Sequence, residues 1–254
     1  MSDHHSRASL PALPALLAAH LACNARIALR TPRAIFGSLL LPALLLVLRS
    51  GRHAAAPHQP AVVAGLTALG VISAAYMAHA SSLVAARDAG VLKRWRTMPV
   101  PAWCYFAARI GASTSVAVAG GLITIAVGAA LNDVRPDPLT VLQLLPTLAL
   151  AAGAWASIGT AVSGFIPSID AAWPLLGLTY LPVLAVSGGF GPIGGQPGWL
   201  VALVGALPAQ AVIHAVTRSL AGDGGLSVRE LGLLLAWTVA GLLVAQRTFK
   251  WQPR

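Results

Sequence analysis

The sequence predicts an all-α polytopic membrane protein, and three observations support this fold class. Of its 254 residues, 57% are hydrophobic and only 9% are charged, whereas roughly a quarter of the residues in a soluble domain are charged. Six spans of about 20 residues need roughly 120 apolar positions, which this composition supplies with little left over. The few charges are also separated by long apolar stretches. We therefore expect a single transmembrane domain over residues 1–254, without an appended soluble domain of ordinary size.

Six transmembrane spans are predicted from the charge-free stretches, because an ionised group in hydrocarbon costs roughly 2.5 to 3.5 kcal/mol. The predicted spans cover residues 34–48, 61–86, 102–131, 139–166, 171–188 and 227–247. The charge-free stretches of the first and last spans hold only 15 and 16 residues, which is short for a hydrocarbon core of about 30 Å. The arginines that flank these two spans are therefore expected to snorkel towards the headgroups.

The apolar segment 197–221 follows a Gly- and Pro-rich stretch and is interrupted by Pro208. It either crosses as a kinked helix or enters the membrane and returns as two half-helices. With six spans and cytoplasmic termini, twelve Lys and Arg residues lie inside and five outside; seven spans give eleven and six. The positive-inside rule therefore favours six spans only weakly.

The basic residues act first as topology signals. The net charge of +10 is scattered between apolar spans, so a nucleic-acid partner is not expected. Arginine outnumbers lysine fifteen to two, a usage typical of GC-rich bacterial genomes. Residues 10–33 predict an amphipathic helix in the cytoplasmic interface, anchored to anionic membrane lipid by Arg26, Arg30 and Arg33 on one side. The alternative is that this segment is the entry to the first span.

Residues that could carry catalysis are scarce. The seven acids form no carboxylate dyad inside a predicted span, and the sequence has neither GxSxG nor HExxH. His79 and His214 are the protonatable groups in apolar segments, and both are expected to be hydrogen-bonded packing residues. A Walker A loop is also absent, since neither lysine stands between Gly and Ser or Thr. The chain is therefore not expected to be an enzyme by itself or to bind a metal or cofactor, and any ATP and Mg²⁺ would belong to a partner.

The segment 87–101 is short, basic and bounded by prolines. It predicts one or two amphipathic turns, with Val91, Leu92 and Trp95 on one face and basic side chains on the other. By physical criteria alone, an ordinary positively charged cytoplasmic loop is an equal alternative. The string from Ala86 to Arg109 is ARDAGVLKRWRTMPVPAWCYFAAR.

This string resembles the signature of the membrane subunits of type-2 ABC exporters, the ABC-2 type permeases. The matching residues are Arg87, Asp88, Gly90, Leu92, Lys93, Arg94, Arg96, Pro99 and Pro101. Two further stretches resemble the same family in the same order. They are RIALRTPRAIFGSLLLPALL near the N-terminus and LAVSGGFGPI followed by WLVALVGALPAQAVIHAVTR towards the C-terminus.

The resemblance implies a half-permease of six spans that pairs with a second copy or a paralogue. It also implies a coupling helix between spans two and three, which docks into one of two separate ATP-binding subunits. The residues that inherit this docking role are Arg87, Asp88, Gly90, Leu92, Lys93 and Arg94. Ala86 stands where the family usually has an acid, so no role of that acid carries over. The segment 197–221, with Pro208, His214 and Arg218, is then a re-entrant hairpin on the outer side, shielded from lipid.

The expected function is ATP-driven export across the bacterial cytoplasmic membrane. The predicted path is largely apolar, and its few polar groups are Ser73, Tyr76, His79, Thr114 and Tyr180. Such a path favours a hydrophobic or amphipathic cargo, such as a drug, antibiotic or lipid-like molecule, over a polysaccharide or haem. The alternatives from other classes are an intramembrane enzyme and a non-transporting assembly anchor. Small residues in span four, from Gly153 to Gly164, are expected to serve close helix packing.

Overall fold

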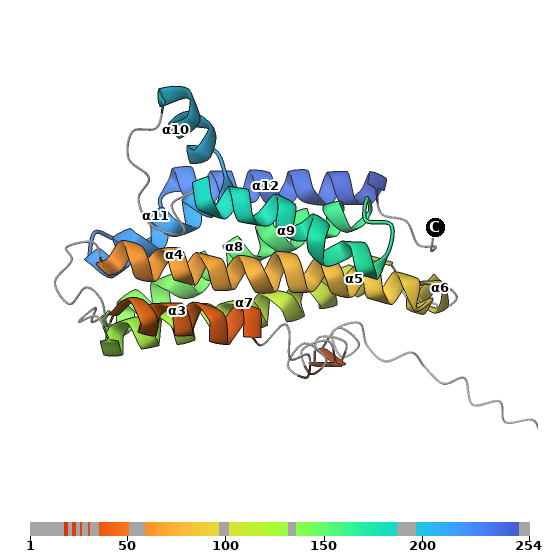
Figure 1. Cartoon of the computed structure of the whole chain (residues 1–254), viewed down its shortest axis with the longest axis horizontal. Coiled ribbons are helices and arrows are strands. Elements are labelled where there is room, and N and C mark those ends of the chain that lie inside the picture. Colours follow the sequence, from red (N-terminus) through yellow and green to blue (C-terminus); the bar gives the residue numbers. More distant parts are fainter. Residues whose placement is uncertain are drawn as a thin grey trace, which may run out of the picture.

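The computed structural model describes residues 36–50, 59–96, 102–131, 136–186 and 197–248, with isolated residues of the N-terminal segment. Within these ranges the chain forms helices joined by turns and contains no strand (Figure 1). The predicted all-helical fold is therefore confirmed for the described part of the chain. The elements are η1 (Phe36–Leu40), α3 (Leu41–Ser50), α4 (Gln59–Ile72), η2 (Ser73–Ala78), α5 (His79–Asp88), α6 (Val91–Arg96), α7 (Ala102–Leu131), α8 (Pro138–Ser163), α9 (Ile169–Val186), α10 (Gly198–Gly205), α11 (Pro208–Ala221) and α12 (Val228–Thr248).

Among the described residues, four helices are long and apolar enough to cross a membrane. They are Pro60–Asp88, Trp103–Leu131, Pro138–Ser163 and Val228–Thr248. The pair α10 and α11 would make a fifth if it crosses, but it bends by 82° at its break. The remaining two predicted spans correspond to η1 with α3 and to α9, which lie alongside the longer helices in Figure 1. By length and composition the structure thus supports four of the six predicted spans, the spans at 34–48 and 171–188 stay predictions, and the α10–α11 pair could add one further crossing.

The helices form a bundle with two distinct ends (Figure 1). The α6 end also holds the beginning of α9 and the C-terminal end of α12, whereas α10 projects from the opposite end. The continuous helix α4–η2–α5 lies at the centre and is the most buried of the four candidate spans. Its apolar side chains pack against α7, α8 and α11 around residues such as Leu66, Ile72, Leu148 and Val212.

Local sequence signals explain where α8 and α12 begin. Asp137 precedes α8 and accepts a hydrogen bond from the Thr140 amide at 2.7 Å, with Pro138 in the first turn. The hydrogen bonds of the Thr140 side chain and backbone lower the pKa of Asp137. Before α12, Ser227 and Glu230 form a capping box: the Ser227 amide donates to Glu230 Oε2 at 2.9 Å, and the Glu230 amide donates to Ser227 Oγ at 3.3 Å.

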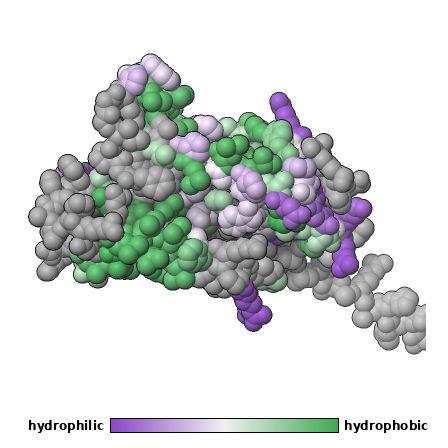
Figure 2. All heavy atoms as spheres, viewed as in Figure 1, coloured by the Kyte–Doolittle hydropathy of each residue, from purple (hydrophilic) through white to green (hydrophobic). Residues whose placement is uncertain are grey.

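The surface matches a protein that lies in lipid. Figure 2 shows hydrophobic side chains gathered along the side of the bundle, and hydrophilic ones at the α6 end. Large exposed apolar residues include Leu178 on α9, Val201 on α10 and Leu243 on α12. An apolar surface of this extent is unusual for a soluble monomer but is expected where acyl chains are the solvent.

Most of the predicted interfacial helix, residues 10–33, lies outside the described residues, including Arg33. Arg26 and Arg30 are described and exposed. The Arg30 amide donates to the Arg26 carbonyl oxygen at 3.0 Å, a spacing found in helical turns. The anchoring role of the three arginines stays a prediction.

Candidate functional site

The coupling segment, residues 87–101, is described as far as Arg96 and begins with a sharp turn at the end of α5. The Ala89 amide donates to the Ala85 carbonyl oxygen at 2.9 Å, and Gly90 then adopts a φ of 71°. No atom lies within 4 Å of the position that a Cβ would take at Gly90. Glycine is required here because L side chains disfavour this left-handed conformation, not because space is short.

Among the described side chains of α6, Leu92 is the buried one. Leu92 is buried in a small cluster with Leu83 of α5 and Tyr105 of α7. Lys93 and Arg94 are exposed beside it. Val91, predicted to share the apolar face, is 38% exposed, whereas the neighbouring Leu92 is buried among side chains of α5 and α7. The side chain of Trp95 lies outside the described part.

Arg87 and Asp88 are adjacent residues that bond to the turn between α8 and α9. The Arg87 side chain is only 2% exposed. Its guanidinium donates to the carbonyl oxygens of Ser163, Ile166 and Pro167, at 3.3, 2.7 and 3.2 Å. Asp88 accepts from Arg87 Nε at 3.3 Å and from the Ile169 amide at 2.9 Å. We call this pair the α8–α9 clamp.

A second arginine, Arg109 of α7, lies near the same end and bonds to α5 and to its own helix. Arg109 donates to Ser82 Oγ at 2.6 Å and to the Tyr105 hydroxyl at 2.9 Å, and its Cζ lies 5.4 Å from the Tyr105 ring centroid. The cation is thus held by hydroxyls and an aromatic face. The Asp88 carboxylate, by contrast, is bonded to Arg87 and to the Ile169 amide in the clamp.

Two of the predicted path residues, Tyr76 and His79, are buried inside the bundle. The Tyr76 hydroxyl lies 2.6 Å from Thr179 Oγ1, and His79 Nε2 lies 3.0 Å from Thr160 Oγ1. Thr160 donates its own hydroxyl proton to the Ala156 carbonyl oxygen at 2.8 Å. Thr160 therefore accepts from His79, the reverse of what a base that activates a nucleophile needs.

The π-helix η2 interrupts the central helix between Ser73 and Ala78. Elements of this kind occur at functional sites more often than their rarity suggests. The Tyr76 ring meets Trp155 of α8 edge-on, with centroids 5.6 Å apart. Gly37 of η1 approaches this region so closely that a Cβ on it would lie 2.8 Å from Ser73 Oγ. The wider turn of η2 is therefore packed on both sides.

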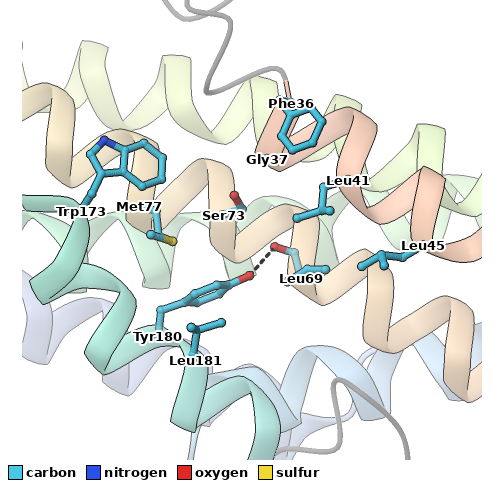
Figure 3. A pocket seen from close by; sticks show the side chains of 10 residues that line it. All are labelled: Phe36, Gly37, Leu41, Leu45, Leu69, Ser73, Met77, Trp173, Tyr180 and Leu181. Carbon is cyan, nitrogen blue, oxygen red and sulfur yellow. Dashed lines mark hydrogen bonds between the residues drawn. The ribbon is translucent and has the colours of Figure 1, made fainter.

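An apolar groove of about 650 Å³ lies between η1, α3, the central helix and α9 (Figure 3). Its lining consists of Phe36, Gly37, Leu41, Leu45, Leu69, Ser73, Met77, Trp173, Tyr180 and Leu181. The Tyr180 hydroxyl donates to the Leu69 carbonyl oxygen at 3.3 Å. Of the predicted path residues, only Ser73 and Tyr180 line this groove. Thr114 lies on α7 away from it.

Two of the small residues on α8, Ser157 and Gly159, lie in helix contacts as predicted, whereas a Cβ on Gly153 would meet no atom within 4 Å. A Cβ on Gly159 would lie 3.2 Å from the Tyr76 carbonyl oxygen. Ser157 faces Gly241 of α12, where an added Cβ would lie 2.7 Å from Ser157 Oγ. These approaches bring α8 close to both the central helix and α12, a use of small residues common in membrane bundles.

The segment 197–221 breaks just before Pro208, as the sequence predicts, and α10 and α11 meet there at 82°. The Ala206 carbonyl oxygen at the break accepts a hydrogen bond from Trp237 Nε1 of α12 at 2.8 Å. This bond satisfies a backbone group that the break frees. Arg218 pairs with Glu230 and donates to the Gly225 carbonyl oxygen at 2.9 Å. His214 is exposed, and its Nε2 lies 2.6 Å from Gln210 Nε2.

The family model for "ABC-2 type transporter" matches residues 15–220, which is most of the chain. The chain belongs to the ABC-2 type transporter family. It is therefore a permease subunit, and permeases of this family work with an ATP-binding subunit. A search of curated proteins finds no match. The matched range includes the coupling segment, the groove, α10 and all of α11 except its last residue.

Several contacts of the permease were not foreseen from its sequence. The Arg87 bonds to the α8–α9 turn, the Arg109–Ser82 bond and the Trp237 bond all join residues far apart in the chain. The one available signal was a Trp in a predicted span, whose indole N–H needs a partner when it leaves water. Among the described residues, no group of three or more His, Cys, Asp or Glu side chains could hold a metal ion. The docking role of residues 87–94 stays a prediction.

Proposed function

We propose that this permease is one half of an ATP-driven exporter of a hydrophobic or amphipathic cargo. A second copy or a paralogue completes the path, and two ATP-binding subunits hold the ATP and Mg²⁺. The single observation that carries the proposal is the apolar groove of about 650 Å³ between η1, α3, the central helix and α9. Its volume falls within the range of roughly 300 to 1,000 Å³ typical of small-molecule sites.

The lining of the groove favours a hydrophobic or amphipathic cargo over a sugar. Its hydroxyl groups are those of Ser73 and Tyr180, and Tyr180 already donates to the Leu69 carbonyl oxygen. A polysaccharide would lose many hydrogen bonds to water here without replacement, and each unpaired polar group is costly to bury. Haem is the closer rival because its ring is apolar, but the lining offers no His for iron and no basic side chain for the propionates.

The two ends of the bundle differ in charge and in helix arrangement, and this difference supports an outward direction of transport. The positive-inside count, twelve to five in the six-span layout, favours a cytoplasmic position for the α6 end. The α10–α11 pair lies at the opposite end (Figure 1) and would face outwards. Both termini would then be cytoplasmic in a bacterial inner membrane. If the cargo is a drug or an antibiotic, the exporter would confer resistance by efflux.

Reconstitution tests this function directly. The permease and its ATP-binding subunit would be placed together in liposomes with a lipophilic fluorescent dye. We expect the dye to move away from the ATP-containing side with hydrolysable ATP, but not with a non-hydrolysable analogue or with the permease alone. Movement that does not depend on ATP, or movement towards the ATP-containing side, would contradict ATP-driven export.

A further inference from the structure

The α8–α9 clamp joins the coupling segment to another part of the bundle. Helix α8 ends at Ser163, and the carbonyl groups of its last turn have no partners within the helix. Arg87 donates to one of them, that of Ser163, and to the two carbonyl oxygens of Ile166 and Pro167 in the turn that follows. A cation at a helix C-terminus is also favoured by the helix dipole. The buried guanidinium thus makes four hydrogen bonds inside the protein, including the one to Asp88.

Asp88 bonds to the other side of the same turn. Its Oδ2 accepts from the amide of Ile169, the first residue of α9, where a negative charge is favoured. Its Oδ1 accepts from Arg87 Nε. Two adjacent residues at the end of α5 therefore bond to the end of α8 and to the beginning of α9.

Helix α9 continues from the clamp to the apolar groove. Trp173, Tyr180 and Leu181 of α9 form one wall of that groove. Further along, α9 is bonded to the central helix twice more, through Thr179 to Tyr76 and through Tyr180 to Leu69. Three hydrogen-bonded levels thus connect α9 to the helix that leads into the coupling segment, while η1 and α3 form the opposite wall.

We infer that Arg87 and Asp88 are positioning residues that transmit displacement of the coupling segment to α9, and thereby move one wall of the groove. This inference rests on the proposed function, and it gives Arg87 and Asp88 a positioning role in place of the docking role that the family resemblance implies for them, because the Arg87 guanidinium is buried against carbonyl oxygens of the α8–α9 turn. Only one short turn, Ala89 and Gly90, separates the clamp from α6. A displacement of α6 therefore reaches α9 through hydrogen bonds rather than through a flexible linker.

The test compares two variants that each remove one positive charge from the same segment. Arg87→Gln deletes the guanidinium donors to the α8–α9 turn, whereas Lys93→Gln changes an exposed side chain three residues after Gly90. Each permease would be purified with its ATP-binding subunit and reconstituted. We expect Arg87→Gln to retain the subunit and to hydrolyse ATP within about twofold of wild type, while dye transported per ATP falls by at least about tenfold. Lys93→Gln should instead lower subunit retention, with hydrolysis and transport falling together.

Hydrogen exchange supplies a readout of the clamp itself. The backbone amides of residues 164–169 should exchange faster in Arg87→Gln, with the rest of the bundle unchanged, because Ile169 would lose a fixed acceptor.

Unchanged transport per ATP in Arg87→Gln would overturn the inference. So would a parallel loss of subunit, hydrolysis and transport, which would make Arg87 part of the docking surface or of the fold. Absence of ATP-dependent transport in the wild type would contradict the proposed function instead.

Discussion

Two glycines on α12 have different surroundings. A Cβ added to Gly241 would lie 2.7 Å from Ser157 Oγ and 2.9 Å from the Ile158 amide nitrogen. Gly232 lies on the same helix with nothing within 4 Å. We expect Gly241→Ala to lower the free energy of unfolding by roughly 1 to 3 kcal/mol, as overpacking does. Gly232→Ala should raise it by up to about 1 kcal/mol, the difference in helix propensity.

Thermal unfolding in detergent, followed by tryptophan fluorescence, measures both variants under one condition. The midpoint should fall for Gly241→Ala and hold or rise for Gly232→Ala. Equal midpoints for the two variants would show that α12 does not pack on α8 as closely as the structure has it.

At the scale of single residues, some features could be predicted from the sequence and others could not. Gly90 and Pro208 were predictable, because a left-handed turn and a helix break depend on the local backbone. The burial of Arg87 was not. Its partners lie 76 to 80 positions further along the chain, and an arginine in a basic loop ordinarily predicts exposure to solvent or a partner.

The orientation of helix α6 depends on the residue directly before it, Gly90. Gly90 has a φ of 71°, which proline cannot adopt because its ring holds φ near −65°. We expect Gly90→Pro to abolish retention of the ATP-binding subunit and transport, while insertion into the membrane is unchanged. Co-purification and a membrane-fractionation assay check the two parts of this prediction.

Gly224 provides the matched control for this element. It also has a positive φ, 93°, with no atom within 4 Å of a Cβ, but it lies between α11 and α12 at the opposite end of the bundle. Gly224→Pro imposes the same backbone conflict and should leave retention of the subunit intact. Normal transport by a well-expressed Gly90→Pro permease would refute the coupling role of α6.

The helices themselves were largely predictable from the spacing of charges. The predicted spans 139–166 and 227–247 differ by only a few residues from α8 and α12, since the cost of an ionised group in lipid restricts where a span can end. The π-helix η2 was not foreseen, because it lies within an uninterrupted apolar stretch and has no composition of its own. The short η1 and α3 leave the six-span layout as a prediction.

At the scale of the whole molecule, the groove brings together residues from η1, α3, the central helix and α9, which no local pattern could have grouped. Leu181 lines it, whereas Leu178, on the same helix, is 71% exposed and does not. We expect Leu181→Trp to reduce dye transport by roughly tenfold by occupying the groove, as pocket contacts worth 1 to 3 kcal/mol allow. Leu178→Trp, which points to lipid, should transport at the wild-type rate.

Leu178→Trp should fold normally because aromatic side chains are tolerated at lipid-facing positions, and Leu181→Trp should fold as well because the groove of about 650 Å³ has room for the larger side chain. Their transport is measured at equal protein content in the same liposomes. Equal transport by both variants would show that the cargo does not pass through the groove. The surfaces between permease copies would then be the alternative path.

The most direct test of the account is purification of this permease from its native membrane in mild detergent, followed by mass spectrometry of what remains bound. We expect a stoichiometric protein with a GxxxxGK[ST] loop to remain bound to the wild-type permease. That protein should be lost from a Lys93→Glu permease, whose exposed coupling-segment charge is reversed. Absence of any ATP-binding subunit from the wild type, even after gentle crosslinking, would contradict the account.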